Sequence, residues 1–228
     1  MSKETVVNVA SITKMFTAAT ILRMIEINEY KEIFPHGVDT KISDLEDILR
    51  NKYPENSEFF KYLKEQEQYE DVTLRHLLQH THGLGSRTPA CFEDILADPQ
   101  KLWEAPEALN PVYLKADTTK GRFGEYKYSN TGYDLLGAII EATASHAKGE
   151  EASYCSMVKE LVIKPLELEN TYTYEDKIPE SITIEHGHIK NQETGEIESD
   201  CPDRYTFAAG MIRSTPSDIA KKEPGREI

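Results

Sequence analysis

Apolar side chains near the start of the chain recur at steps of three and four residues, which is the period of an α-helix. The pattern runs from residue 11 to residue 27 and ends where Asn28 stands. The positions that carry it are Ile12, Met15, Phe16, Ala19, Leu22 and Ile25. With Ile21 and Met24, apolar side chains cover much of the helix circumference, so the pattern predicts a helix that belongs between two layers of structure.

Three further helical patterns follow in the first half of the chain. SDLEDILRNKY (residues 43 to 53) and SEFFKYLKEQEQ (residues 57 to 68) predict two short surface helices. VTLRHLLQHTHGLG (residues 72 to 85) predicts a third helix, with Thr73 at its N-cap. Gly83 suits the left-handed turn that often ends a helix.

The second half of the chain changes character after two more helical patterns. A loop-rich stretch precedes NTGYDLLGAIIEAT (residues 130 to 143), which predicts a strongly apolar helix. Residues 151 to 164 predict another helix that stops before Pro165. From 170 to 212, TYTYED, SITIEHGHI and YTFAAGMI are rich in β-branched and aromatic residues, so short strands are expected. The chain is therefore predicted to be α+β.

Composition excludes some classes of function. The chain has 228 residues, of which 39% are hydrophobic and 29% charged, as in a globular protein. Its net charge of −14 argues against a surface for nucleic acid or anionic membrane. No apolar run is long enough to span a bilayer, and no signal peptide precedes the first helix. The chain as given is therefore expected to be cytoplasmic, and the sequence leaves its native compartment open.

Neither the cysteines nor the histidines predict a metal site. Cys91, Cys155 and Cys201 are far apart and form no C-x-x-C pair, which argues against a zinc ribbon or a disulfide framework. His76 and His80 have the spacing of metal ligands on a helix, but no glutamate stands between them.

The remaining histidines lie in a turn and in a possible strand. His82 falls in the turn after the predicted helix, and His186 and His188 share one face of the possible strand. We expect these side chains to bond the ends of helices and loops, and we predict no metal.

The pattern Ser-x-x-Lys is a candidate for chemistry. It occurs three times, as Ser11 with Lys14, Ser145 with Lys148 and Ser156 with Lys159. For Ser11 two interpretations stand at this point. It is either the N-cap of the first helix or a nucleophile beside a lysine.

Tyr128, Ser129 and Asn130 form the second candidate, directly before the apolar helix. In one interpretation Asn130 caps that helix and Tyr128 fills a gap in the core. In the other, the Tyr128 phenol pairs with Ser11 and passes protons.

Five segments occur together in an order that is typical of one family. They are NVASITKMFTA, VTLRHLLQHTHGL, YKYSNTGYDLLGAIIE, VIKPLELENT and YTFAAGMIRSTPSDIAK. With them the chain resembles the serine β-lactamase-like family, which includes class C β-lactamases, D-alanyl-D-alanine carboxypeptidases and related esterases. S-x-x-K is a signature of the wider penicillin-recognising group. The resemblance covers nearly the whole chain, and in it RHLLQHTHGL looks like a structural segment.

The resemblance implies a role for each matching residue. Ser11 matches the nucleophile, Lys14 the lysine beside it, and Tyr128 and Asn130 the Y-x-N element. To act as a base, Lys14 needs a pKa lowered from about 10.4 towards 7, which requires a buried site. Asn130 would hold the substrate carbonyl or orient Lys14. The implied reaction passes through an acyl-serine, on a β-lactam, a D-alanyl peptide or an ester, without a cofactor.

The chain also departs from the family. Relatives carry several dozen residues before the nucleophile, and a third motif, K-T-G or H-x-G, after the segment that matches AAGM. The lookalikes here, residues 186–188 and 193–195, precede that segment. In relatives the missing strand supplies an oxyanion-hole donor, and the loss of one such donor costs on the order of 10² to 10³ in rate.

From these departures we expect one partial domain over residues 1 to 228, with an off-pattern tail at about 221 to 228. It should be mostly the helical part of a β-lactamase/transpeptidase-like fold, with an incomplete antiparallel sheet. One face of the first helix should then be exposed and able to self-associate.

Two functional interpretations remain. The chain is either a serine hydrolase with a small-molecule or peptide substrate, or a catalytically inactive fragment or binding module of the same fold.

Overall fold

The computed structural model describes most of the chain. The described residues are 2–86, 94, 103–117, 121–182, 184–185, 187–190, 195, 197–200 and 207–221. Side chains are described for all of these except residues 116, 187–190 and 197–200.

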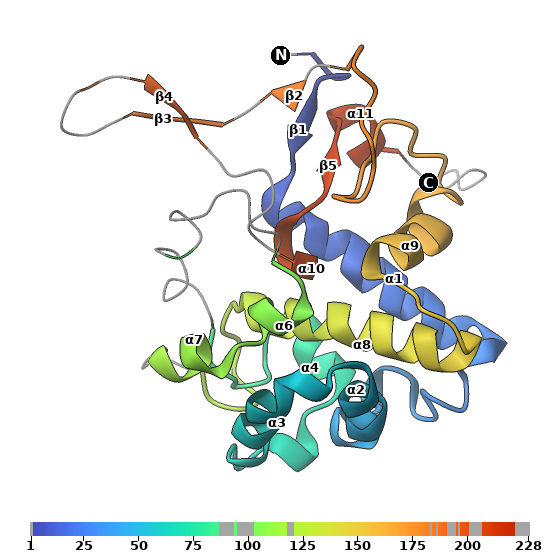
Figure 1. Ribbon diagram of the computed structural model, residues 1–228, viewed down its shortest axis with the longest axis vertical. Coiled ribbons are helices and arrows are strands. Elements are labelled where there is room, and N and C mark those ends of the chain that lie inside the picture. The colour runs from blue at the N-terminus through green and yellow to red at the C-terminus, as the bar shows by residue number, and fades with distance from the viewer. Residues whose placement is uncertain are drawn as a thin grey trace.

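Helices dominate the described part of the chain (Figure 1). They are α1 (Thr13–Glu26), α2 (Glu46–Lys52), α3 (Ser57–Lys64), α4 (Leu74–Leu78), α6 (Ala105–Ala108), α7 (Pro111–Ala116), α8 (Asn130–Lys148), α9 (Tyr154–Val158), α10 (Phe207–Gly210) and α11 (Pro216–Ile219). A π-helical turn, η7 (Lys159–Ile163), extends α9, and a 3-10 turn, η1 (Ala10–Ile12), leads into α1. Among the described helices, none has the length and hydropathy that a transmembrane segment needs.

The strands are short and form two small sheets. They are β1 (Val6–Asn8), β2 (Ile184–Glu185), β3 (Gly187–Lys190), β4 (Ile197–Asp200) and β5 (Arg213–Ser214). One sheet has the order β2-β1-β5, and the other pairs β3 with β4 in antiparallel fashion. The prediction of an antiparallel sheet is right for β1 with β5 and wrong for β1 with β2, which run parallel.

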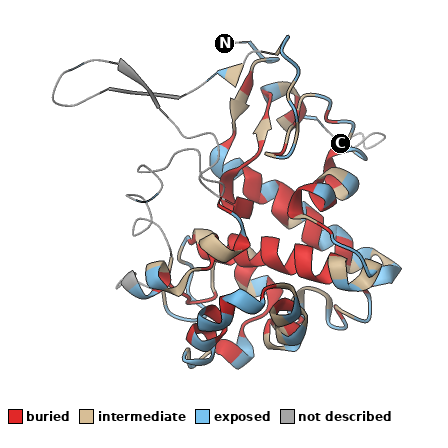
Figure 2. Ribbon diagram, viewed as in Figure 1, coloured by how far each residue is buried: buried red, intermediate tan, exposed pale blue. Residues whose placement is uncertain are grey.

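Helix α8 is the centre of the core. Every residue from Thr131 to Ala144 is buried, as Figure 2 shows by colour. Helices α1 and α10 pack against one part of its surface, and α2, α4 and α9 against others. The apolar pattern of residues 130 to 143 therefore predicted the most buried helix correctly, and burial on all sides is its physical reason.

The segment YTFAAGMI is the clearest error of the sequence analysis. Phe207–Gly210 is a helical turn, α10, and not a strand. It lies so close to α8 that a Cβ added to Gly137 would approach the Cβ of Ala208 to 2.3 Å. The Thr17 hydroxyl also donates to the Ala208 carbonyl at 2.6 Å, so α10 is fixed between α1 and α8. A short apolar segment does not reveal from its sequence which structure it takes.

The helix predicted at residues 72 to 85 ends earlier than expected. Thr73 is its N-cap, as predicted, and forms a capping box with His76. The last residue of α4 is Leu78, and His80 already has a left-handed backbone, with φ of 58°. Gly83 has φ of 69° but lies in the loop that follows, so it does not end the helix.

Helix α1 exposes one apolar face, as the incomplete sheet predicts. Met15 is 63% exposed, and Ile12 and Leu22 are 41% and 43% exposed. Ile21 and Met24 lie on the opposite face and are buried in the core, as is Phe16 at the edge of the exposed stripe. The helix thus packs on one layer and presents the other side to solvent.

Glu46 joins three elements of the helical region. Its carboxylate accepts bonds from Arg50 Nε at 2.6 Å and Tyr69 Oη at 2.6 Å, and Lys64 Nζ lies 2.9 Å away. Burial opposes ionisation of this carboxyl group, but the bonds from Tyr69, Lys64 and Arg50 outweigh it and lower its pKa to about 2. The contribution of Glu46 to stability is therefore present above its ordinary pKa of 4.5 and is lost as the pH falls towards 2.

Glu46→Gln should lower the free energy of unfolding at pH 7, and the deficit should shrink as the pH falls from 4.5 towards 2. Urea denaturation of both proteins over that pH range measures it. Glu58→Gln, at an exposed position in the first turn of α3, is the matched control and should change little. A Glu46→Gln deficit that is independent of pH would contradict the prediction.

Candidate active site

Ser11 lies in the 3-10 turn that connects β1 to α1. The preceding residue, Ala10, has φ of 43°, a left-handed backbone that is uncommon for a residue with a Cβ. Asn8 holds this turn, because its Oδ1 accepts the Ala10 N–H at 2.9 Å. Ser11 itself is exposed, and the N-cap of α1 is Ile12. The interpretation of Ser11 as the helix cap is therefore wrong, and the turn presents its hydroxyl to solvent.

Lys14 is one helical turn further on and points into the protein. Its side chain is buried, with the residue 6% exposed. Its Nζ donates to Asn130 Oδ1 and to the Ala209 carbonyl, each at 2.8 Å. The same nitrogen lies 3.3 Å from Ser11 Oγ. It also lies 5.0 Å from the centre of the Tyr128 ring, a cation–π distance.

Tyr128 completes the group from the other side of Ser11. Its hydroxyl lies 2.7 Å from Ser11 Oγ, although the two residues are 117 positions apart. The ring is 45% exposed and does not fill a gap in the core. Asn130 does not cap α8 either, because Ser129 is the N-cap and the Asn130 amide is bonded to Lys14. The four residues singled out in the sequence are thus brought together.

The geometry permits proton transfer from Ser11. A neutral lysine has two N–H groups and one lone pair. Lys14 can keep both 2.8 Å bonds with its N–H groups and receive the Ser11 proton with the lone pair. The Tyr128 hydroxyl can accept a proton from Ser11 or donate one to it.

The other two Ser-x-x-Lys copies have structural roles. Ser145 Oγ accepts the Ala152 N–H at 3.0 Å, and Ser156 Oγ donates to the Ser153 carbonyl at 2.8 Å. Their lysines form ion pairs, Lys148 with Glu160 at 2.8 Å and Lys159 with Asp176 at 2.5 Å. Neither serine contacts its lysine in the way that Ser11 contacts Lys14.

His76, His80 and His82 accept hydrogen bonds from backbone N–H groups around α4 and in the loops near it. His76 Nδ1 accepts the Thr73 N–H at 3.1 Å, and His82 Nδ1 accepts the Leu84 N–H at 3.0 Å. Burial lowers the pKa of His82 to about 4, so it is neutral at pH 7. His80 Nδ1 accepts the Ser129 N–H at 3.2 Å.

Of the cysteines and the other two histidines considered for metal binding or disulfides, the structure describes the side chain of Cys155 alone. Cys155 is a buried thiol. His186, Cys91, Cys201 and the side chain of His188 lie outside what the structure describes.

Two contributors to the site were missed in the sequence analysis. One is the Ala209 carbonyl, which binds Lys14. The other is His80, which touches the Tyr128 ring with ring centres 4.7 Å apart. A backbone carbonyl carries no residue signature, and His80 was assigned only to the family's structural segment. Their place in the segments AAGM and QHTHGL was the only available signal.

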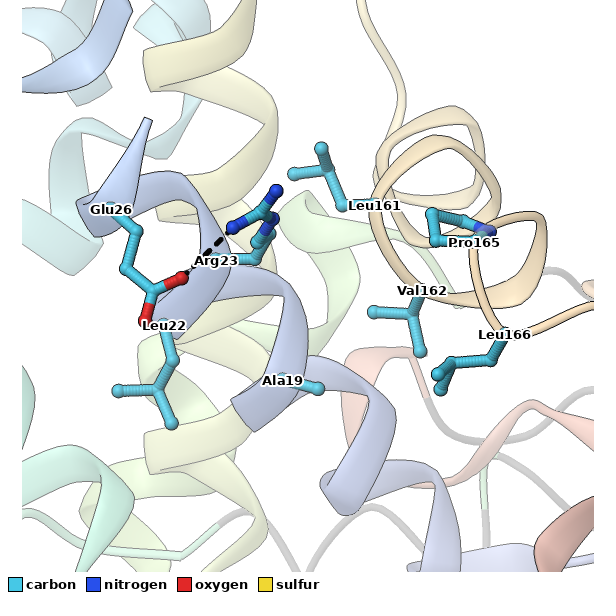
Figure 3. Close-up of a pocket in the computed structure, with 8 residues that line it drawn as sticks. All are labelled: Ala19, Leu22, Arg23, Glu26, Leu161, Val162, Pro165 and Leu166. Atoms are coloured by element: carbon cyan, nitrogen blue, oxygen red, sulfur yellow. Dashed lines mark hydrogen bonds and ion pairs between the residues drawn. The ribbon is translucent and has the colours of Figure 1, made fainter. Parts of the chain in front are cut away.

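A cavity of about 460 Å³ lies elsewhere, along the second half of α1 (Figure 3). Apolar side chains from α1 and from the end of η7 face one another across it, and Arg23 bonds Glu26 at its edge at 3.0 Å. The lining residues are Ala19, Leu22, Arg23, Glu26, Leu161, Val162, Pro165 and Leu166. None of them belongs to the group around Ser11, so this cavity is separate from the candidate site.

A family model described as beta-lactamase matches residues 1–222. The chain belongs to the beta-lactamase family. It is 31% identical to a penicillin-binding protein of Bacillus subtilis (strain 168) over 122 residues, which are 50% of this chain and 24% of that relative.

Solved structures share the fold of this beta-lactamase family member. The octameric penicillin-binding protein homologue from Pyrococcus abyssi superposes with a TM-score of 0.66 at 24% identity, over 96% of this chain and 44% of that one. D-amino acid amidase from Ochrobactrum anthropi SV3 gives 0.63 at 23% identity, over 97% and 55%. The chain thus spans about half the length of the solved structures it matches, and the β-lactamase/transpeptidase-like fold is confirmed.

Proposed function

We propose that this chain carries the nucleophile and the proton-transfer groups of a serine hydrolase that works through an acyl-serine. One observation supports this most directly: Ser11 Oγ is within hydrogen-bond reach of both Tyr128 Oη, at 2.7 Å, and Lys14 Nζ, at 3.3 Å. A nucleophile next to a base that is itself oriented by a third group is the usual arrangement for activating a hydroxyl.

In the proposed reaction Ser11 Oγ attacks the carbonyl carbon of the substrate. Its proton passes to neutral Lys14 as the new C–O bond forms. The tetrahedral intermediate then expels the amine or alcohol, which takes the proton held by Lys14 through Tyr128, so that Lys14 is neutral again. Water attacks the acyl-serine in the second half, releases the carboxylic acid and restores the Ser11 hydroxyl. Asn130 keeps Lys14 in place throughout.

The surroundings of Ser11 favour its action as a nucleophile. It stands directly before α1, a helix of 14 residues, whose positive N-terminal end favours a developing negative charge on Oγ. Lys14 is buried, and burial disfavours its charged form.

The proposed substrates are compounds with a reactive carbonyl, namely a β-lactam, a D-alanyl peptide or an ester. The family and the amidases and penicillin-binding proteins that share the fold support this range. A chromogenic β-lactam, a D-amino acid amide and a short ester form the test panel. The second functional candidate is a binding module of the same fold, which would leave Ser11 unmodified.

We also propose that the exposed face of α1 mediates self-association. The apolar residues on this face are Ile12, Met15, Ala19 and Leu22. An apolar stripe of this kind gains free energy when a second surface covers it. The octameric state of the Pyrococcus abyssi homologue shows association in that protein.

A fluorophosphonate or a β-lactam probe should label Ser11 and no other Ser-x-x-Lys serine. Ser11 is the one of the three that contacts its lysine and a tyrosine. Peptide mass mapping locates the label, and Ser11→Ala should abolish it. A label on Ser145 or Ser156, or none at all, would reject the assignment.

Lys14→Ala should slow acylation of Ser11 by roughly 10² to 10⁴, the usual contribution of a general base. Lys14→Arg should be similarly slow, because a guanidinium can donate to the same acceptors but does not give up its proton. Lys159→Ala removes one of the two other lysines that follow a serine by three positions, and this lysine lies in an ion pair. This variant should label at the wild-type rate. Wild-type labelling of Lys14→Arg would show that Lys14 is not the base.

The variant Met15→Lys, Leu22→Lys should shift the chain towards monomer in light scattering and reduce its binding of a hydrophobic dye. The matched control is Val112→Lys, at a position that is 69% exposed on α7, away from the stripe. Because the chain carries a net charge of −14, added salt should strengthen association of the wild type. If the α1 double variant and Val112→Lys showed the same light scattering and the same dye binding, the exposed face of α1 would not be the surface of self-association.

A further inference from the structure

His80 binds the backbone N–H groups of the two residues that flank Tyr128. The His80 carbonyl accepts the Lys127 N–H at 2.8 Å, and its Nδ1 accepts the Ser129 N–H at 3.2 Å. One residue, 48 positions before the tyrosine, thus fixes the backbone immediately before and immediately after it.

The imidazole ring also fixes the plane of the phenol. Its centre lies 4.7 Å from that of Tyr128, with an angle of 36° between the rings. Tyr133 of α8 and Tyr126 of the same loop lie at 5.1 Å and 5.9 Å. Aromatic rings at these separations attract one another and restrict rotation.

The backbone of His80 is held in an unfavourable conformation to make these contacts. Its φ of 58° lies in the left-handed region, which is uncommon for residues other than glycine, although histidine and asparagine are enriched there. The next carbonyl, that of Thr81, accepts the Gly124 N–H at 2.9 Å, so the loop that carries Tyr128 is bound along this turn. Strained residues persist where the surrounding structure fixes them, and they cluster at functional sites.

We propose that His80 is the positioning residue for Tyr128: through its carbonyl and its neutral imidazole it keeps the phenol hydroxyl next to Ser11, and protonation of the imidazole releases it. This inference rests on the proposed function. Nδ1 can accept the Ser129 N–H only when it carries no proton, so the proton of the neutral ring sits on Nε2. In the protonated imidazole, Nδ1 carries a hydrogen and is a donor like the Ser129 N–H, so the bond between them is lost.

The groups around the ring favour its neutral form at pH 7. Those that titrate or carry charge are Lys14 from α1, Tyr126 and Tyr128 from the loop, Tyr133 from α8 and His82 from the same turn. Burial of the imidazole lowers the pKa of His80 below its usual 6.5, and Lys14 lowers it further whenever its own nitrogen is protonated.

The test compares His80→Ala with His80→Asn. Asparagine tolerates the left-handed backbone, offers an amide oxygen as acceptor and does not titrate in the relevant range. The measurement is the second-order rate of Ser11 labelling by a fluorophosphonate from about pH 5 to about pH 9. His36→Asn, at an exposed position, is the control.

At neutral pH His80→Ala should label on the order of 10² more slowly than the wild type, the effect of a small displacement of a reacting group. His80→Asn should retain most of the labelling rate at neutral pH. In the wild type the rate should fall when His80 is protonated at acid pH, and in His80→Asn this fall should be absent. Wild-type rates and an unchanged pH profile in both variants would overturn the inference while the proposed function stands.

A second readout does not depend on activity. In the wild type, the Ser129 amide should be protected from hydrogen exchange, and its NMR signal should titrate together with the His80 ring nitrogens. His80→Asn should keep the protection, and His80→Ala should lose it if it folds. Absence of labelling in the wild type would refute the proposed function alone, whereas an unprotected Ser129 amide would refute the role of His80.

Discussion

The burial of Lys14 is the constraint on which the arrangement around Ser11 depends. A lysine nitrogen taken out of water destabilises the fold unless acceptors replace its hydration. Here the acceptors come from separate parts of the chain: Asn130 at the start of α8, the Ala209 carbonyl of α10, and Ser11 in the preceding turn. Three elements must therefore meet at one nitrogen, and each of them is fixed by packing elsewhere in the molecule.

Helix α8 provides most of that packing. Because it is buried along nearly its whole length, its first residue, Asn130, is held by the core and not by the surface loop before it. Gly137 lets α10 approach closely enough for Ala209 to reach Lys14. The hydroxyl of Thr13 accepts the Ile212 N–H at 3.0 Å, which secures the chain that leaves α10. The apolar core and the polar site are thus parts of one arrangement.

The phenol reaches Ser11 by a different route. Its loop is bound to the turn after α4, through His80 and Thr81, and α4 is in turn tied to α8 by the bond from Tyr133 Oη to the Leu78 carbonyl at 3.0 Å. The contact of 2.7 Å between Tyr128 and Ser11 therefore depends on how α1 and α4 sit on opposite parts of α8. A disturbance in the turn after α4 would move the phenol without touching the serine or the lysine.

The sequence by itself determined the main helices, because apolar spacings of three and four residues place side chains on one face of a helix. The spacing gave Ser11 with Lys14 as one of three Ser-x-x-Lys copies, and the resemblance to the family selected it. Tyr128 and Asn130 were candidates from the residues alone, and the resemblance to the family assigned their roles. It could not show that α10 is a helix, that Ser11 precedes the cap of α1, or that the Ala209 carbonyl and His80 join the site. The contacts of the Ala209 carbonyl with Lys14 and of His80 with Ser129 link residues more than 40 positions apart. The first of them also uses a backbone carbonyl, a group that every residue possesses. Only the packing of α1, α4 and α10 on α8 decides which of these groups meet.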